Sequence, residues 1–287
     1  MTDSPGKVCL LTGATQGIGR AAAESLIHTG MRLILVARDP VRLRAVAEQL
    51  GRVAPGAEVE TLAGDLSRVA EVRRLAAEFR ARHRRLDVLL NNAGATFTRR
   101  EVTPEGLERT FALNHLAYFV LTQELLPILK TSAPARIVNV SSAAHLRARL
   151  DLDDLQYERR RYAGMAAYGQ SKLLNVLFTR ELARRLEGSG VTVNAMHPGF
   201  VRTGFGHNTP GLFKTATQVA QLFARTPEQG AGTLVYLATS PAVANVTGQY
   251  FFDERPTRTS PIAEDAVAAR RLWEESERLA ASHAAAA

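Results

Sequence analysis

A tyrosine and a lysine four residues apart, Tyr168 and Lys172, stand early in a helical pattern that runs to Arg185. Residues at this spacing share one face of a helix. A tyrosine hydroxyl has a reference pKa near 10, so it serves as a general acid or base near neutral pH only when a neighbouring cation favours its phenolate. The pair therefore indicates proton-transfer chemistry, although Tyr-x-x-x-Lys also occurs often on helix surfaces without a catalytic role.

A glycine-rich turn, Gly13-Ala14-Thr15-Gln16-Gly17-Ile18-Gly19, follows an apolar run and opens a helical pattern that stops at Gly30. Glycines at a strand-to-helix turn let the backbone approach a pyrophosphate, and the helix N-terminus offers free N–H groups. The spacing differs from GxGxxG, and no Gly-Lys-Ser/Thr follows, which disfavours a nucleotide triphosphate loop. The turn indicates a dinucleotide site, with purely structural glycines as the alternative.

The end of the second apolar run bears on which dinucleotide would bind. Folds that select NAD place an acidic residue there to bind the ribose hydroxyls. Here Ala37 and Arg38 occupy that place. A guanidinium suits a phosphate through its charge and its fork of donors, so Arg38 is a candidate ligand for the 2′-phosphate of NADP. An ordinary surface arginine is the alternative.

These residues need a framework, and the apolar runs supply one. Runs rich in β-branched residues alternate with long helical patterns, which predicts βαβ units and an α/β fold. The runs are continuously apolar, as expected when helices cover both faces of a parallel sheet. The predicted strands are Val8 to Thr12, Leu33 to Ala37, Val59 to Ala63, Val88 to Asn91, Ile137 to Val140, Val191 to Ala195 and Gly248 to Phe252.

No linker or repeat interrupts this series, so residues 1–287 are predicted to form a single doubly wound Rossmann-type domain with a parallel, seven-stranded sheet. Residues 7–142 would be the cofactor-binding half and residues 143–262 the catalytic and substrate-binding half. Residues 263–287 would form a C-terminal helix, Ala263 to Ala281, and a frayed tail. Gly199 to Thr226 breaks the alternation and is interpreted as a loop over the substrate.

Taken together, the motifs resemble those of the classical short-chain dehydrogenase/reductases, in family order and from roughly Lys7 to Asp253. The matching positions are Gly13, Gly17 and Gly19; Asp65-Leu66; Asn91-Asn92-Ala93-Gly94; Asn114; Ser141-Ser142; Tyr168 and Lys172; and Pro198-Gly199 with Val201 and Thr203. The joint match is specific even though each motif alone is weak.

The resemblance implies a catalytic set of Asn114, Ser142, Tyr168 and Lys172. Tyr168 would exchange the proton, and Ser142, the second serine of its pair, would hydrogen-bond the substrate oxygen. Lys172 would bind the nicotinamide ribose and depress the tyrosine pKa, and Asn114 would hold a water. The implied cofactor-binding residues are Gly13, Thr15, Gln16, Gly17, Ile18, Gly19, Arg38, Asp65, Leu66, Asn92, Ala93, Gly94, Tyr168, Lys172, Pro198, Gly199, Val201 and Thr203.

The chain is most similar to the retinol dehydrogenase-like branch, through Phe111 to Leu116, Arg136 to Ser142, Leu173 to Gly190 and His197-Pro198-Gly199. It lacks the N-terminal anchor of the membrane-bound members, which argues against a retinoid role. The 25 residues between Ser142 and Tyr168 are interpreted as a flap beside the pocket. Its charges are expected to be solvated surface, with substrate recognition as the alternative.

Composition narrows the class of protein. A net charge of +8 and a pI of about 10.1 raise nucleic acid as a partner, but the arginines are scattered and lack the interleaved aromatic residues that stack bases. The single Cys9 lies in an apolar run, which indicates a buried thiol and a reducing compartment. No stretch is long enough to span a membrane, and no Cys, His and carboxylate cluster has metal-ligand spacing. His115 and His197 are expected to be structural.

We therefore expect a cytoplasmic oxidoreductase that moves a hydride between NADP(H) and an apolar alcohol or carbonyl substrate, with no metal, no nucleic acid partner and no membrane span. The same chemistry with NAD(H), or a regulator that binds NADP(H) without turnover, are the alternatives. The family habit of pairing through the helices that carry Asn114 and Tyr168 predicts a homodimer or homotetramer.

Overall fold

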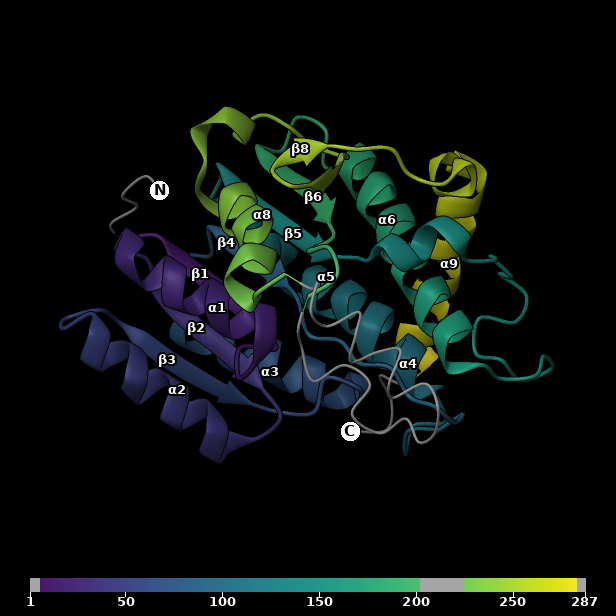
Figure 1. Ribbon diagram of the computed structural model, residues 1–287, viewed down its shortest axis with the longest axis horizontal. Coiled ribbons are helices and arrows are strands. Elements are labelled where there is room, and N and C mark those ends of the chain that lie inside the picture. Colours follow the sequence, from purple (N-terminus) through teal and green to yellow (C-terminus); the bar gives the residue numbers. More distant parts are fainter. Residues whose placement is uncertain (1–5, 202–224, 283–287) are drawn as a thin grey trace.

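One eight-stranded sheet runs through the protein, whose computed structural model describes residues 6–201 and 225–282 (Figure 1). The strand order is β3-β2-β1-β4-β5-β6-β7-β8. Strands β1 to β7 pair in parallel, and only β8 is antiparallel to its neighbour. The strands are β1 (Val8–Thr12), β2 (Arg32–Ala37), β3 (Val59–Ala63), β4 (Val88–Asn91), β5 (Ala135–Val140), β6 (Val191–Met196), β7 (Tyr250–Phe252) and β8 (Arg255–Pro256).

The predicted doubly wound α/β domain is confirmed, but the prediction of seven strands is wrong by one. The extra strand, β8, has two residues and pairs with β7 through Phe252 and Arg255. Asp253 and Glu254 join the two strands, both at positive φ. A strand this short carries no hydrophobic periodicity, so the sequence pattern gave no indication of it.

Helices cover both faces of the sheet, and each face has its own hydrophobic core (Figure 1). Helices α1, α2 and α8 pack on one face, where the core is built around residues such as Leu11 and Leu35. Helices α3, α5, α6 and α9 pack on the other, around residues such as Phe79 and Leu174. The helices are α1 (Gly17–Leu26), α2 (Pro40–Val53), α3 (Val69–Arg82), α4 (Arg109–Phe111), α5 (Ala117–Thr131), α6 (Gly164–Arg185), α8 (Pro227–Thr239) and α9 (Ala266–Ser282).

Strand order reverses between β1 and β4, which are neighbours in the sheet although β2 and β3 separate them in sequence. In doubly wound sheets, ligands bind outside the carboxyl ends of the strands at such a switch point. The glycine turn follows β1 and the Asn92 to Gly94 segment follows β4. The topology therefore brings the two predicted cofactor segments to one edge.

The C-terminal helix packs against the helices that carry the candidate catalytic residues. Trp273 of α9 lies 5.0 Å from Phe119 of α5 and 5.9 Å from Phe178 of α6, measured between ring centroids. The predicted helix, Ala263 to Ala281, in fact begins at Ala266 after a 3-10 turn, Pro261–Glu264. Helix α9 thus covers part of the α5 and α6 surface that the family resemblance assigns to subunit pairing.

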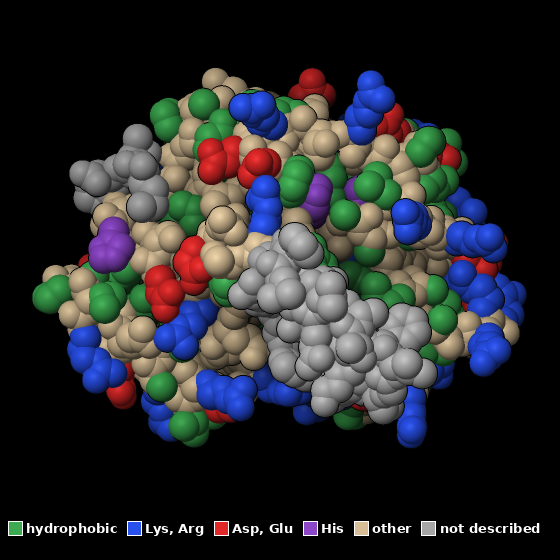
Figure 2. Space-filling view, viewed as in Figure 1, with side chains coloured by type: hydrophobic (Ala, Val, Ile, Leu, Met, Phe, Trp, Pro, Cys, Tyr) green, Lys and Arg blue, Asp and Glu red, His purple; other side chains and the backbone are tan. Residues whose placement is uncertain are grey.

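On the face seen in Figure 2, Lys and Arg side chains stand mainly around the rim, most densely at its right-hand edge, with acidic side chains among them. Many arginines pair with carboxylates on their own helix, such as Arg74 with Glu71 and Glu78. Within residues 6–201 and 225–282, no helix has the length and hydrophobicity needed to cross a bilayer.

Candidate active site

The glycine turn and the segment after β4 are joined by a buried threonine. Thr12 Oγ1 accepts hydrogen bonds from the Asn92 and Ala93 amides at 2.9 and 3.0 Å. Asn92 Nδ2 in turn donates to the Thr12 carbonyl at 2.8 Å. A Cβ atom added to Gly13, which has φ +72°, would lie 2.8 Å from Ala93 Cα. The turn therefore requires glycine at Gly13 to bring these two loops into contact.

The first turn of α1 has the features of an anion site. Its N-cap residue, Gln16, makes no capping hydrogen bond, and the turn contains no acidic side chain. The amides of this ten-residue helix are consequently available, and the helix dipole favours a negative group. Thr15 and Ile18 are partly buried beside it, while Gly19 is buried so closely against Gly13 that a Cβ there would lie 2.2 Å from the Gly13 carbonyl oxygen. These residues fit a pyrophosphate.

Arg38 lies at the carboxyl end of β2, exposed, and forms no ion pair with any residue that the structure describes. The nearby carboxylate of Asp39 is committed elsewhere, because it caps α2 by accepting from the Val41 and Arg42 amides at 2.9 and 3.1 Å. At the end of β3, Asp65 Oδ1 accepts from the amide and hydroxyl of Ser67, and Leu66 is buried. The sheet thus brings Arg38 and the Asp65 segment to the same edge as the glycine turn.

Tyr168 lies in the second turn of α6, partly buried beside Ser142. A hydrogen bond from Ser142 lowers the Tyr168 pKa, but desolvation by burial dominates and raises that pKa to about 12. Ser142 also accepts from the Ala144 amide at 3.2 Å. Its neighbour Ser141 points elsewhere and donates to the Lys172 carbonyl at 2.7 Å. The geometry places Ser142, not Ser141, against the tyrosine hydroxyl.

Lys172 follows one turn later in α6 and is buried between two tyrosine rings, 5.7 Å from the Tyr168 centroid and 5.6 Å from that of Tyr118. Its ammonium donates to the Val140 carbonyl at 3.0 Å, and burial lowers its pKa to about 7. The sequence argument expected Lys172 to depress the tyrosine pKa. In the protein without cofactor, desolvation dominates the Tyr168 pKa, and the lowering by Lys172 together with a bound oxidised nicotinamide stays a prediction.

The cofactor-side glycine Gly94 lies close to both polar groups of this site. A Cβ added there would be 3.2 Å from Asn114 Oδ1 and 3.3 Å from Lys172 Nζ. Asn114 belongs to a π-helical turn, Ala112–Leu116, and its side chain pairs with both backbone groups of Ala95 at 2.9 Å. Asn114 therefore anchors the loop after β4. It also contacts α6 twice, because its side-chain amide donates to Ser171 Oγ at 3.0 Å and its backbone carbonyl accepts from Asn175 Nδ2 at 2.8 Å.

Beyond β6, Pro198 and Gly199 are partly buried, and Gly199 has φ +81°. Val201 forms an isolated bridge with Arg225. Thr203 and most of the predicted substrate loop, Gly199 to Thr226, lie outside the described residues. The structure therefore describes this predicted cofactor segment only as far as Val201, and the role of Thr203 stays a prediction.

The segment between Ser142 and Tyr168 is organised by a buried carboxylate. Asp154, whose side chain is 3% exposed, accepts from the amides of Glu158 and Arg160 at 2.7 and 3.0 Å and from Arg160 Nε at 3.1 Å. The Tyr162 hydroxyl lies 2.8 Å from Thr110 Oγ1. The expectation of solvated charges is wrong for Asp154, which holds the segment together.

Three large apolar side chains lie exposed within a few residues, along the chain, of candidate catalytic or cofactor positions. Leu146 follows Ser142 in a 3-10 turn and is 51% exposed. Met165, one turn before Tyr168, is 65% exposed, and Phe200 after Gly199 is 60% exposed. Single exposed apolar residues are common, but three that neighbour predicted site residues along the chain are compatible with an apolar substrate.

Both histidines singled out in the sequence are enclosed by neighbouring side chains. His197 stacks on Phe252 with a centroid distance of 4.3 Å, and burial lowers its pKa to about 4. His115 is fully buried and hydrogen-bonds Asn175 and Ser276. Sequence reasoning missed Thr12 and Asn175, whose only signal is a polar residue inside an otherwise apolar run.

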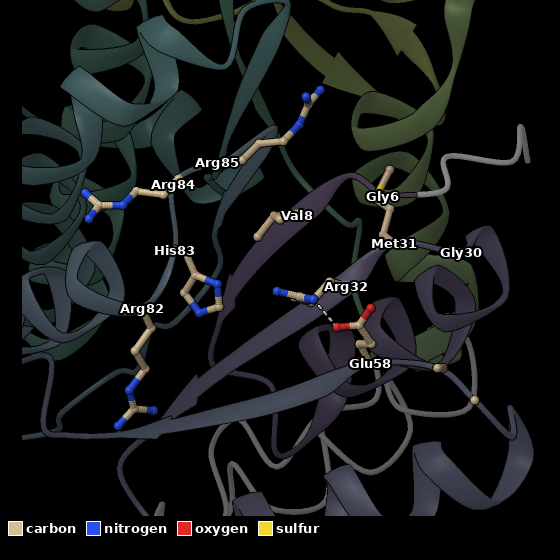
Figure 3. A pocket seen from close by; sticks show the side chains of 12 residues that line it. Gly6, Val8, Gly30, Met31, Arg32, Glu58, Arg82, His83, Arg84 and Arg85 are labelled. Carbon is tan, nitrogen blue, oxygen red and sulfur yellow. Dashed lines mark ion pairs between the residues drawn. The ribbon is translucent and has the colours of Figure 1, made fainter.

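A separate cavity of about 340 Å³ lies at the opposite edge of the sheet, where Val8 and Arg32 begin their strands. In Figure 3, Arg32 pairs with Glu58 and faces His83, whereas Arg82 and Arg84 extend away from the cavity. None of the predicted site residues lines it. In the part of the chain that the structure describes, no three Cys, His or acidic residues gather in a potential metal site.

Comparisons with known proteins agree with this geometry. The sequence profile described as short chain dehydrogenase matches residues 7–211. The chain is 42% identical to human retinol dehydrogenase 13 over 280 residues, which covers 96% of this chain and 85% of the relative. It is 40% identical to human retinol dehydrogenase 12 over 269 residues, covering 94% and 84%.

Solved structures show the same architecture. A crystal structure of a Mycobacterium paratuberculosis protein aligns with a TM-score of 0.79 and 33% identity, covering 98% of this chain and 96% of that chain. The Pseudomonas aeruginosa RhlG/NADP active-site complex aligns with a TM-score of 0.70 and 29% identity, covering 87% and 95%.

Proposed function

The chain belongs to the short chain dehydrogenase family and is an oxidoreductase similar to the retinol dehydrogenases. We propose that it reduces apolar carbonyl compounds with NADPH, or catalyses the reverse oxidation. The observation that carries the proposal is the contact of Tyr168 with Ser142, one helical turn from the buried Lys172, beside the dinucleotide edge of the sheet.

A bound nicotinamide dinucleotide supplies or accepts the hydride, and the protein supplies position and the proton. With a pKa of about 12, Tyr168 is protonated at neutral pH and donates to the carbonyl oxygen as that oxygen gains charge. Ser142 hydrogen-bonds the same oxygen and stabilises the developing alkoxide. Lys172, with its pKa of about 7, exchanges protons readily at neutral pH and binds the ribose hydroxyls.

The preference for NADP(H) rests on Arg38, which is exposed and without an ion pair among the described residues, and on Asp39, whose carboxylate caps α2. A guanidinium at the end of β2 favours a 2′-phosphate, whereas no free carboxylate is present there to bind the ribose hydroxyls of NAD. A relative of known structure is described as an NADP complex, which supports the same choice.

The apolar substrate class rests on Leu146, Met165 and Phe200, which are exposed and lie next to predicted site residues in the sequence. Burying such side chains against a substrate contributes about 25 cal/mol per Å² of apolar surface removed from water. The curated relatives are named retinol dehydrogenases, and retinol is itself an apolar alcohol. A cytoplasmic location is part of the proposal, supported by the buried free thiol of Cys9.

The experiment is a panel of aliphatic, aromatic, steroid and retinoid carbonyls assayed with NADPH and NADH by loss of nicotinamide absorbance. We expect turnover of apolar aldehydes or ketones with NADPH, and lower activity toward small polar ones. Tight NADPH binding, measured by titration, without turnover of any carbonyl would overturn the enzymatic proposal and favour a cofactor-binding regulator.

A further inference from the structure

Asn175 lies fully buried in α6, three residues after Lys172, and its amide nitrogen donates to two backbone carbonyls. It reaches the Asn114 carbonyl at 2.8 Å and the Val140 carbonyl at 3.3 Å. Val140 is also the acceptor for the Lys172 ammonium, at 3.0 Å. One amide group therefore connects the π-helical turn with the end of β5, where the Val140 carbonyl also accepts from Lys172.

The orientation of that amide is set by its two carbonyl acceptors. Since the nitrogen of Asn175 must face these oxygens, its own oxygen faces His115 Nδ1, 3.3 Å away. Burial lowers the His115 pKa to about 4, so the ring is neutral and carries a single proton.

The other ring nitrogen contacts α9. His115 Nε2 lies 3.0 Å from the Ser276 hydroxyl oxygen, which has no exposed surface and donates its own proton to the Leu272 carbonyl at 2.7 Å. The ring itself packs between Phe111, at 5.5 Å, and Phe178, at 6.1 Å between centroids. A continuous chain of buried polar contacts thus runs from the C-terminal helix to the acceptor of Lys172.

We propose that Asn175 is a positioning residue for the reaction: it holds the Val140 and Asn114 carbonyls at a fixed spacing, and through the Val140 carbonyl it positions the Lys172 ammonium, while His115, in contact with Ser276, packs against its amide oxygen. The proposal rests on the proposed function, since it concerns the lysine of that site. Asn175 does not contact the substrate and acts only through these groups.

The test replaces Asn175 with leucine, which has a similar volume and no amide. The matched control is Thr179→Val. Thr179 is another buried polar residue of α6, two turns after Lys172, and its hydroxyl donates to the Asn175 backbone carbonyl. In Asn175→Leu we expect kcat for carbonyl reduction to fall about tenfold or more, with KM within about twofold, because reacting groups lose their alignment. Thr179→Val should keep kcat within about twofold.

A second measurement needs no turnover. The titratable groups facing Lys172 are Tyr168 of its own helix and Tyr118 of α5. The histidines contribute alike to wild type and variant, so the difference between their pH dependences of unfolding above pH 7, in cofactor-free protein, reports on the lysine. Asn175 and Lys172 both donate to the Val140 carbonyl. Without the Asn175 amide, this carbonyl stabilises the Lys172 ammonium more strongly, so Asn175→Leu should raise the Lys172 pKa and shift its titration to higher pH. His115→Phe, in its aromatic surroundings, should give a smaller loss of kcat.

Failure of the two proposals is distinguishable. If no carbonyl is turned over by the wild type, the function fails, but the titration shift still tests the positioning role. The inference would be overturned if the Lys172 titration is unshifted in Asn175→Leu and kcat falls no further than in Thr179→Val. Asn175 would then be a packing residue.

Discussion

Replacing Lys172 with methionine should stabilise the cofactor-free protein while abolishing its activity. Burial lowers the Lys172 pKa from 10.5 to about 7. At 1.36 kcal/mol per unit, this means that the buried ammonium costs about 5 kcal/mol below pH 7. The variant loses the hydrogen bond to Val140, worth about 1 kcal/mol, although Asn175 still donates to that carbonyl.

Allowing for relaxation around the charge, we expect the free energy of unfolding to rise by about 3 kcal/mol at pH 6 in Lys172→Met. The sign of the pH dependence follows from proton binding. Between pH 7 and 10.5 the unfolded lysine holds a proton that the native lysine has lost, so wild-type stability rises with pH. The variant lacks this rise, and the difference between the two proteins should shrink toward about pH 10.

The assay is denaturant unfolding of both proteins at a series of pH values from 6 to about 9, below the range where tyrosines ionise in the unfolded chain. The control is Lys130→Met at the exposed end of α5, which should change stability by less than about 0.5 kcal/mol. A Lys172→Met variant that is less stable than wild type at pH 6, or that keeps the wild-type pH dependence, would refute the reasoning.

Three further predictions concern other parts of the molecule. Ser142→Ala should reduce kcat far more than Ser141→Ala, by about a hundredfold for loss of one oxyanion donor; the reverse order in steady-state kinetics would move the role to Ser141. NADPH should bind about tenfold to a hundredfold more tightly than NADH, and Ala37→Asp with Arg38→Ser should narrow or reverse this preference in cofactor titrations; equal wild-type affinities would contradict it. Trp273→Ala should lower the free energy of unfolding by about 3–5 kcal/mol in chemical denaturation, and a loss below about 1 kcal/mol would mean that α9 is not firmly packed.

The strands and the cofactor edge could be predicted from sequence because their signals are local. Continuous apolar runs mark buried parallel strands, and glycines or polar residues directly after them mark the carboxyl edge. The bounds of β1, β3 and β4 match the predicted runs, and Gly30 ends the first helical segment with φ +74°. The specific residues Tyr168, Ser142 and Lys172 were found from spacing together with family resemblance.

What the sequence could not provide depends on groups far apart in the chain. The high pKa of Tyr168 comes from burial, which spacing alone does not reveal. The link from Asn175 through His115 to Ser276 spans 161 residues between its last two members. The predicted homodimer or homotetramer stays a prediction, and because α9 covers part of α5 and α6, we expect any pairing to use another surface.

The most direct test of the central claim follows the hydride itself. An apolar carbonyl identified in the panel is reduced with NADPH that carries deuterium at the transferable position of the nicotinamide, and the alcohol is analysed by mass spectrometry. The account predicts one deuterium on the carbinol carbon, with turnover largely lost in Tyr168→Phe, which retains the ring and should still bind NADPH. An alcohol without deuterium, or near-normal turnover in Tyr168→Phe, would contradict it.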